Sequence, residues 1–248
     1  MTPSRRVVAV TGAGGALGAA ISRRLASEPA TDLLLTDVSA PSLEATLAGL
    51  SDTDGSVETA LADVSDFAQV ESVVNRAVER YGHLDVLISN AGVLSANGRI
   101  HNLADEEWER AFRINVLGAV HGIRAAVGVM RPQHAGSIVL TASVSGLTAW
   151  SHAAPYCATK AAVIQLAKVA AVEYARDGIR VNCVCPGTFL SAIHDGLPPD
   201  ALEAVAARHP LGLGSADDLV GAYSYLASED SRWTTGSAMV VDGGYSAP

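Results

Sequence analysis

Residues 7–18 read Val7-Val8-Ala9-Val10-Thr11-Gly12-Ala13-Gly14-Gly15-Ala16-Leu17-Gly18. The four apolar residues predict a buried strand, and the glycines predict a tight turn that opens a helix at the amphipathic stretch after Ile21. Glycine lets the backbone approach a pyrophosphate, and a helix N-terminus offers unpaired N–H groups with a partial positive charge. The stretch therefore indicates a phosphate cradle built without lysine. Taken alone, it is equally typical of an ordinary strand-to-helix turn.

Asp37 ends the next apolar run, Leu33-Leu34-Leu35-Thr36. A dinucleotide-binding fold places its ribose-binding acid at about this distance after the glycine turn. A carboxylate there accepts hydrogen bonds from both ribose hydroxyls and repels the 2′-phosphate of NADP. No Lys or Arg stands in the turn or just after Asp37 to attract that phosphate, so the sequence favours NAD. The alternative is that Asp37 only caps a helix beginning near Ser39 or Pro41.

Tyr156 precedes Lys160 by four residues, so one helical turn places a phenol and an ammonium on the same face. Ser143 comes before them, at the end of a β-branched run. A free tyrosine has a pKa of about 10, and a neighbouring cation stabilises its phenolate. The trio thus predicts an acid/base group for a substrate hydroxyl. Without other evidence the spacing is weak, because it occurs by chance on solvated helices.

Short aliphatic runs alternate with helical stretches along the whole chain. The runs lie near Val7, Leu33, Val57, Val86, Ile138 and Val181, with a last strand at 238–241. This alternation predicts an α/β fold, a doubly wound parallel sheet with helices on both faces, of the Rossmann type. At 248 residues and 49% hydrophobic, the chain is expected to form a single domain over residues 1–248. The motifs then converge on one crevice outside the carboxyl ends of the strands.

Taken in this order, the motifs resemble the short-chain dehydrogenase/reductase family along essentially the whole chain. The resemblance implies hydride transfer between a nicotinamide cofactor, here NAD, and a secondary alcohol or ketone of small to medium apolar character. It implies a catalytic tetrad of Asn115, Ser143, Tyr156 and Lys160. The implied cofactor-binding residues are Gly12, Gly14, Gly15, Ala16, Leu17, Gly18, Asp37, Asp63, Val64, Asn90, Ala91, Gly92, Tyr156, Lys160, Pro186, Gly187 and Thr188. No metal site is expected.

By the same resemblance, the Tyr156 phenolate takes the proton of the alcohol while Ser143 holds its oxygen. Lys160 bonds the nicotinamide ribose and, with the positive nicotinamide ring, lowers the pKa of Tyr156. Asn115 holds a water that links Lys160 to solvent.

Two positions depart from the family pattern. The middle glycine of its turn is Ala16 here, so the turn is shifted slightly or carries a methyl towards the cofactor. Many relatives have a threonine after Pro-Gly that bonds the nicotinamide carboxamide, and either Thr188 or Ser191 takes that place here.

Residues 188–213 correspond to the substrate loop of the family, and their apolar residues predict a mostly apolar pocket wall. These residues are Phe189, Leu190, Ile193, Leu197 and Leu213. Trp150, His152 and His194 are candidate substrate contacts, although each is more typical of a half-exposed structural side chain.

Composition excludes some partners. A net charge of −9 and a pI near 5.2 argue against nucleic acid, which binds through clustered cations. No apolar run approaches the ~20 residues that cross a bilayer, and no signal peptide is visible, so we expect a soluble, cytoplasmic protein without a membrane partner. Cys157, Cys183 and Cys185 are expected to be free thiols.

Small residues are frequent in the helices expected at 115–130 and 156–176. They either accommodate the sheet beneath or let a second subunit pack closely in a four-helix bundle. By resemblance we expect a homotetramer, with the C-terminal strand and tail forming the other interface.

Other functions are also compatible with the sequence. The runner-up is a 3-oxoacyl-carrier-protein reductase, although such enzymes generally prefer NADPH and present basic residues to the carrier. A catalytically silent dinucleotide-sensing protein is the alternative from another class, and the complete Ser143, Tyr156 and Lys160 set argues against it. The same set, with Asp37, argues against a non-redox lyase or dehalogenase on this scaffold.

Overall fold

The computed structural model describes residues 5–50, 53–191 and 199–247. Its strands form one parallel sheet in the order β3-β2-β1-β4-β5-β6-β7. The strands are β1 (Arg6–Thr11), β2 (Thr31–Asp37), β3 (Val57–Leu61), β4 (Val86–Ser89), β5 (Gly136–Thr141), β6 (Ile179–Pro186) and β7 (Ala238–Val241). The predicted doubly wound parallel sheet is confirmed, and each strand coincides with an aliphatic run in the sequence.

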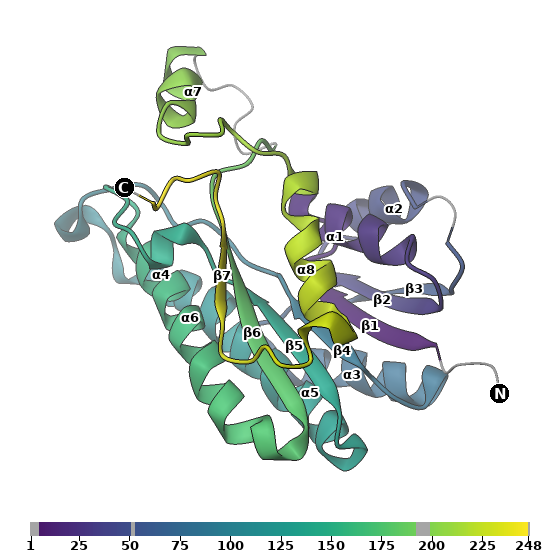
Figure 1. The fold of residues 1–248 in the computed structure, drawn as a ribbon. Helices are drawn as coiled ribbons and strands as arrows, with labels where there is room; N and C mark the ends of the chain where they lie inside the picture. Colours follow the sequence, from purple (N-terminus) through teal and green to yellow (C-terminus); the bar gives the residue numbers. More distant parts are fainter. Residues whose placement is uncertain (1–4, 51–52, 192–198, 248) are drawn as a thin grey trace.

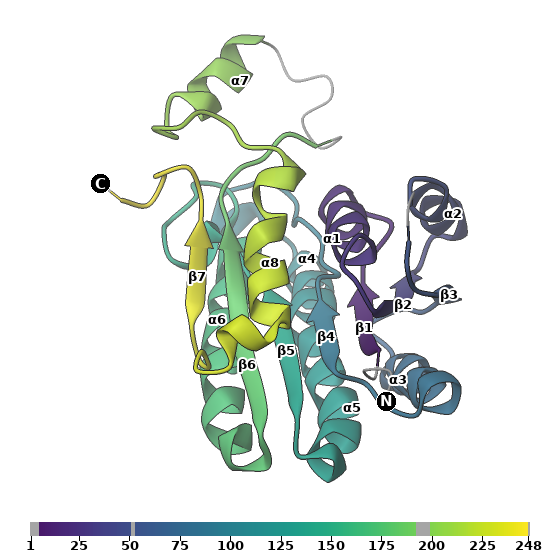
Figure 2. The same cartoon turned by 45° about the vertical axis from the view of Figure 1, so that its right-hand side comes forward.

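Helices cover both faces of the sheet (Figures 1 and 2). The α-helices are α1 (Ala16–Ala26), α2 (Ala40–Ala48), α3 (Phe67–Tyr81), α4 (Asp105–Ala111), α5 (Gly118–Gln133), α6 (Ala154–Tyr174), α7 (Pro199–Ala206) and α8 (Val220–Ala227). Shorter turns are η1 (Ile100–Asn102), η2 (Phe112–Leu117), η3 (Val144–Gly146), η4 (Ala175–Asp177), η6 (Ala216–Asp218) and η7 (Glu229–Ser231). Of these, η2 is a π-helical turn that leads into α5.

Two hydrophobic cores lie against the two faces, because successive side chains of a strand point to opposite sides. On β1, Val7 and Ala9 pack with α3, α5 and α6, whereas Val8 and Val10 pack with α1, α2 and α8. Figure 2 shows α8 in front of the sheet and α6 behind it. A strand buried on both sides must be apolar throughout, which explains the uninterrupted run at 7–10.

The strand order reverses beside β1, where β2 continues on one side and β4 on the other. Crossovers leave this point in opposite directions, so a crevice opens at the carboxyl ends of β1 and β4. Helix α7 stands beyond this end of the sheet (Figure 1). It belongs to the expected substrate loop, of which Ile193, His194 and Leu197 lie outside the described residues.

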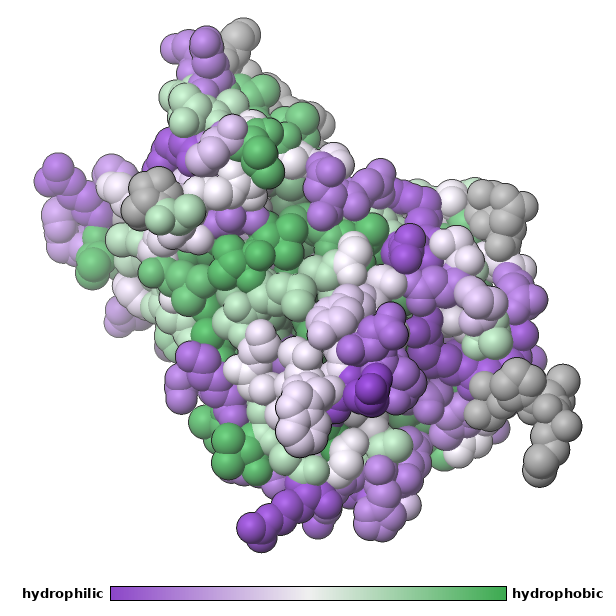
Figure 3. Space-filling view, in the orientation of Figure 1, coloured by the Kyte–Doolittle hydropathy of each residue, from purple (hydrophilic) through white to green (hydrophobic). Residues whose placement is uncertain are grey.

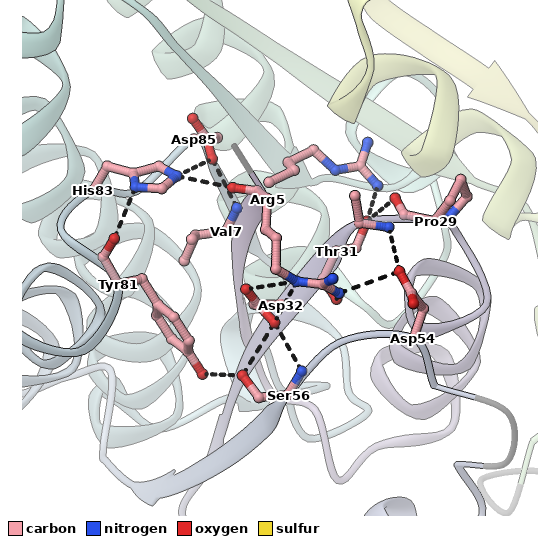
Figure 4. A network of polar contacts seen from close by, with 12 residues as sticks. Arg5, Val7, Pro29, Thr31, Asp32, Asp54, Ser56, Tyr81, His83 and Asp85 are labelled. Carbon is pink, nitrogen blue, oxygen red and sulfur yellow. Dashed lines mark hydrogen bonds and ion pairs between the residues drawn. The ribbon is translucent and has the colours of Figure 1, made fainter. Parts of the chain in front are cut away.

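The opposite end of the sheet is held by a polar network (Figure 4). Asp32, near the start of β2, is 6% exposed and accepts hydrogen bonds from Arg5 Nε at 3.1 Å. It also accepts the backbone N–H of Ser56 at 2.8 Å, and the Ser56 hydroxyl lies 3.0 Å from that of Tyr81. Asp32 therefore ties the starts of β1, β2 and β3 to the end of α3.

Within the part of the chain that the structure describes, no helix has the length and apolar character needed to pass through a bilayer.

We expect Asp32→Ala to lower the free energy of unfolding by about 2 kcal/mol, because the Ser56 N–H and the Arg5 Nε lose their acceptor, while Arg5 keeps its contact with Asp54. Chemical unfolding followed by circular dichroism measures the change. Asp217→Ala is the matched control: its carboxylate is 76% exposed and pairs with Arg23 at 3.5 Å, a contact worth less than about 1 kcal/mol. Equal effects of the two substitutions would contradict the role given to Asp32.

Candidate active site

The glycine turn between β1 and α1 is a cradle of exposed backbone. Gly12 has φ +63°, and a Cβ there would lie 2.7 Å from the Cα of Ala91, so only glycine fits. A Cβ on Gly18 would lie 2.1 Å from the Gly12 carbonyl oxygen. Helix α1 begins after Gly15 without a side-chain cap, which leaves its first N–H groups free for an anion. Ala16 is the first helical residue and is exposed, so its methyl stands at the mouth of the cradle.

Asp37 ends β2 beside this cradle. One carboxylate oxygen accepts the Gly14 N–H at 3.0 Å, and the other accepts the Ser39 N–H at 3.1 Å. The N-cap of α2 is Ser39, whose hydroxyl accepts the Ser42 N–H. The alternative that Asp37 only caps this helix is therefore wrong, and its carboxylate lies at the glycine turn.

Asn90 joins the ends of three strands. Its amide nitrogen donates to the carbonyl oxygens of Thr11 and Gly12 at 3.2 and 3.1 Å, and its amide oxygen accepts the Thr141 hydroxyl at 3.2 Å. The Thr11 hydroxyl in turn accepts the backbone N–H of Asn90 and Ala91. The crevice between β1 and β4 thus has a fixed floor.

Asn115 is buried in the π-helical turn η2 and clamps the segment after β4. Its side chain pairs with both backbone groups of Val93, accepting the N–H at 2.8 Å and donating to the carbonyl at 2.9 Å. It also donates to the Thr159 hydroxyl at 3.1 Å. Both amide hydrogens are therefore used inside the protein, and the side chain clamps this segment. That Asn115 holds a water linking Lys160 to solvent stays a prediction. π-Helical turns of this kind are frequent at functional sites.

Ser143, Tyr156 and Lys160 meet at the carboxyl end of β5. Ser143 follows this strand, and its hydroxyl accepts the Ser145 N–H at 3.1 Å. Lys160 is 4% exposed; its Nζ donates to the Thr141 carbonyl at 2.8 Å and lies 5.7 Å from the centre of the Tyr156 ring. Gly92 lets the β4 segment approach, since a Cβ there would lie 3.3 Å from Nζ.

Burial governs the protonation of this trio. It raises the pKa of Tyr156, while a hydrogen bond with the Ser143 side chain acts in the opposite direction. Burial also lowers the pKa of Lys160 to about 8. In the protein by itself the pKa of the phenol is therefore not lowered as predicted, because burial of Tyr156 outweighs the hydrogen bond with Ser143.

The remaining predicted residues lie at the same end of the sheet. Asp63 is exposed after β3, and Val64 is buried against η2 and α5, where a Cβ on Gly118 would lie 2.8 Å from its methyl group. Pro186 ends β6, and Gly187 donates its N–H to the Val241 carbonyl at 2.9 Å. Leu17 is buried under the cradle.

Four supporting residues were not singled out from the sequence. Thr11 and Thr141 bond Asn90, and Thr159 bonds Asn115. His209, 3% exposed, accepts the Thr188 N–H on Nε2 at 3.2 Å. Threonine hydroxyls at strand ends are a usable signal in the sequence, but nothing in residues 188–209 indicates that His209 folds back onto Thr188.

Of the other candidate substrate contacts, Trp150 stacks on Tyr156 with ring centres 6.1 Å apart. His152 is exposed and has φ +68°, which makes it a turn residue. Phe189 packs against the core formed with α1 and α8, so it is not a free pocket wall. The three cysteines are free thiols, as predicted.

A cavity of about 860 Å³ lies at the amino end of the sheet, lined in part by Arg5, Arg180 and Trp233. No predicted site residue lines it. In the described residues no group of three His, Cys, Asp or Glu side chains is placed to hold a metal ion. The candidate active site is therefore the motif-lined crevice at the other end.

Comparison with known proteins gives a match over the whole fold. The family model described as enoyl-(acyl carrier protein) reductase matches residues 12–246. Levodione reductase of Leifsonia aquatica is 35% identical over 98% of this chain and 94% of its own length. Meso-2,3-butanediol dehydrogenase of Serratia marcescens is 35% identical (98% and 95%), and 3-oxoacyl-[acyl-carrier-protein] reductase of Thermotoga maritima is 32% identical (96% and 97%).

Solved structures of other proteins superpose on the whole fold of this chain. A short-chain type dehydrogenase/reductase from Mycobacterium marinum superposes with a TM-score of 0.88 at 30% identity, covering 99% of this chain and 96% of the other. An NAD+-bound xylitol dehydrogenase gives 0.91 at 29% identity, and ElxO with NADP bound gives 0.92 at 28%. Each of these two covers 98% of this chain and 100% of the other.

We expect Lys160→Met to raise the free energy of unfolding at pH 7 by about 2 kcal/mol. A lysine whose pKa falls from 10.5 to about 8 on folding is penalised fully below pH 8, by about 1.4 kcal/mol per pKa unit, less about 1 kcal/mol for the lost bond to Thr141. The penalty disappears as the pH rises from 8 to 10.5, so the free energy of unfolding of wild type rises relative to that of the variant over this range. Unfolding at several pH values measures the difference.

Lys168→Met, which changes an exposed lysine on the same helix, is the control. Its difference from wild type in the free energy of unfolding should be the same at each pH. A pH-independent difference for Lys160→Met would refute the lowered pKa.

Proposed function

The chain belongs to the short-chain dehydrogenase/reductase family, and we propose that it transfers hydride between NAD and a secondary alcohol or ketone of small to medium apolar character. One observation carries this proposal. Ser143, Tyr156 and Lys160 meet at the same end of the sheet as the glycine cradle and Asp37. Proton transfer and dinucleotide binding therefore have their groups on one side of the molecule.

The residues of the crevice fit a dinucleotide. The uncapped start of α1 would bind the pyrophosphate, Asp37 the adenosine ribose, and Asp63 with Val64 the adenine. Asn90, Ala91 and Gly92 would line the nicotinamide side together with Pro186 and Gly187. The Thr188 N–H is already donated to His209 and is not free for the cofactor. The carboxamide would therefore be bound by the Thr188 hydroxyl or by Ser191. When bound, the nicotinamide ring supplies the carbon that exchanges hydride with the substrate.

The protein's own groups would then handle the proton. Tyr156 accepts the hydroxyl proton of the alcohol in one direction and returns it in the other, and the Ser143 hydroxyl donates a hydrogen bond to the substrate oxygen. Lys160 would bond the ribose and, in its ammonium form 5.7 Å from the ring centre, would stabilise the phenolate as it forms. Asn115 positions the segment after β4 against Lys160.

Asp37 supports NAD over NADP. Its carboxylate is held at the cradle by the Gly14 and Ser39 N–H groups, and residues 31–50 contain no Lys or Arg that would balance a 2′-phosphate. Bound cofactors of both kinds occur among the similar structures, so the choice depends on this carboxylate.

The second candidate is a 3-oxoacyl-[acyl-carrier-protein] reductase, favoured by the 32% identity with the Thermotoga maritima enzyme. Asp37 speaks against NADPH, and a net charge of −9 speaks against an acidic carrier. A silent dinucleotide sensor would have no need of Ser143, Tyr156 and Lys160 together.

The proposed organisation is one domain over residues 1–248, with residues 188–213 as the substrate loop. We propose that the domains assemble as a homotetramer. Apolar side chains stand exposed on the outer faces of η2 and α6, including Leu117 and Val172 (81% exposed). Val240 is exposed on the edge strand β7, and Trp233 (98%) is exposed in the segment before this strand. Figure 3 shows a band of apolar residues on this face of the molecule. Covering two such patches takes two different interfaces, and light scattering would measure the subunit number.

Replacing the phenol by Tyr156→Phe should lower turnover of a secondary alcohol with NAD by about 100-fold or more, because the group that moves the proton is removed. Binding of NADH, followed by its fluorescence, should be retained. Tyr174→Phe, at the far end of the same helix, is the matched control and should keep wild-type turnover. Near-normal turnover of Tyr156→Phe would refute the assignment.

Replacing the acid by Asp37→Ser should weaken NADH binding by roughly tenfold, since charge-assisted hydrogen bonds to the ribose are lost. It should strengthen NADPH binding by a similar factor, since the like-charge repulsion is removed. Fluorescence titrations with the two reduced cofactors measure both changes. A wild-type protein that binds NADPH more tightly than NADH would overturn the role of Asp37.

A further inference from the structure

Tyr223, in α8, is 0% exposed and packs in the core between this helix and the sheet. Its hydroxyl lies 2.9 Å from the hydroxyl of Thr141, at the carboxyl end of β5. The Thr141 hydroxyl donates to the amide oxygen of Asn90 at 3.2 Å, and the Asn90 amide nitrogen donates to the carbonyl oxygens of Thr11 and Gly12. We call this series, from Tyr223 through Thr141 to Asn90, the hydroxyl chain.

Only one arrangement of hydrogens satisfies every member of the hydroxyl chain. Both amide hydrogens of Asn90 are donated to carbonyl oxygens, and its amide oxygen can only accept. That oxygen accepts from Thr141, which uses the one hydrogen of the threonine hydroxyl. The phenol of Tyr223 must therefore donate to the Thr141 oxygen. Burial raises the pKa of Tyr223, so the phenol keeps the hydrogen that it donates.

This donation controls the one group of the chain whose hydrogen can turn. A threonine hydroxyl rotates freely, whereas the Asn90 amide and the backbone carbonyls have fixed directions. The phenol hydrogen occupies one side of the Thr141 oxygen and so directs the Thr141 hydrogen towards Asn90. A hydroxyl that accepts a hydrogen bond is also more polarised and donates more strongly. Tyr223 thus orients and strengthens the bond that holds Asn90.

Thr141 serves both halves of the candidate active site. Its hydroxyl holds Asn90, whose amide bonds the end of β1 and the glycine turn. Its backbone carbonyl accepts Lys160 Nζ at 2.8 Å. Tyr223 has no surface of its own in the crevice, since it is fully buried, so its effect on the reaction must pass through Thr141.

We propose that Tyr223 is a positioning residue for the reaction, which acts through Thr141 on Asn90 and so holds the glycine cradle in the shape that binds NAD. The inference rests on the proposed function, because it takes the cradle to be the site of the dinucleotide.

A second hydroxyl between β5 and α8 provides the matched comparison. Ser137, 3% exposed at the other end of β5, donates to the Leu226 carbonyl of α8 at 2.8 Å. Both hydroxyls join the same strand to the same helix. The bond of Ser137 ends at that carbonyl, whereas the bond of Tyr223 continues to the cradle. Ser137 therefore contributes to packing alone.

The test measures NADH binding by fluorescence titration. Tyr223→Phe keeps the ring and deletes the phenol hydroxyl, so it should weaken NADH binding by about 3-fold. Thr141→Val, which leaves the Asn90 oxygen without a donor, should weaken it by about 10-fold or more. Thr141→Ser keeps a hydroxyl in this place and should bind NADH as wild type does, within about twofold.

Ser137→Ala is the control, and chemical unfolding shows how much stability each variant loses. It should lower the free energy of unfolding about as much as Tyr223→Phe does, yet leave NADH binding unchanged. Added to Thr141→Val, Tyr223→Phe should change NADH binding by less than about 1.5-fold, because the chain is already interrupted.

Wild-type NADH binding by Tyr223→Phe overturns the proposal, as does an equal loss in Ser137→Ala, which would indicate packing alone. Fully additive losses in Tyr223→Phe and Thr141→Val overturn it too, since Tyr223 would then act by another route. The comparison of Tyr223→Phe with Ser137→Ala stands even where Thr141→Val does not fold. Failure of the proposed function looks different: wild type then binds neither NADH nor NADPH, and both proposals fall together.

Discussion

The structure depends on how closely the ends of β1 and β4 approach each other. Gly12 comes so near Ala91 that a Cβ has no room, and the amide of Asn90 bonds the carbonyls on the β1 side of this contact. Because Asn90 also accepts from Thr141, the end of β5 is drawn into the same network. These close backbone contacts fix the ends of the strands that line the crevice. They therefore also fix the positions from which the side chains of the site extend.

The same network sets the environment of Lys160. Thr141, held by Asn90, presents its carbonyl to the ammonium, and Gly92 leaves space for the lysine against the β4 segment. The lysine is consequently buried, and burial lowers its pKa to about 8. A base strength in this range suits a group that must exchange protons near neutrality. The geometry that makes the crevice rigid therefore also tunes the chemistry of its central cation.

Much of this could be predicted from the sequence because it depends on local patterns. Aliphatic runs such as Val7–Val10 mark buried strands, and parallel strands carry the residues after them to one edge. That argument brought together Gly12, Asp37, Asn90 and Ser143 correctly. Properties that depend on burial or on long-range packing could not be predicted from such local patterns. The pKa of Tyr156 depends on how much solvent reaches the ring, and the Thr188–His209 bond depends on a fold-back across 21 residues that no short-range pattern records.

The polar network around Asp32 lies at the end of the sheet opposite to the crevice. Stability and chemistry are in this way assigned to opposite ends of the same strands, in the manner of enzymes that keep one scaffold while their reactions diverge. Residues of the candidate active site, such as Ser143 and Tyr156, lie at the other end of the sheet from the groups that hold the strand starts together. The scaffold is therefore well placed for evolution or engineering to change its substrate range while the folded state endures.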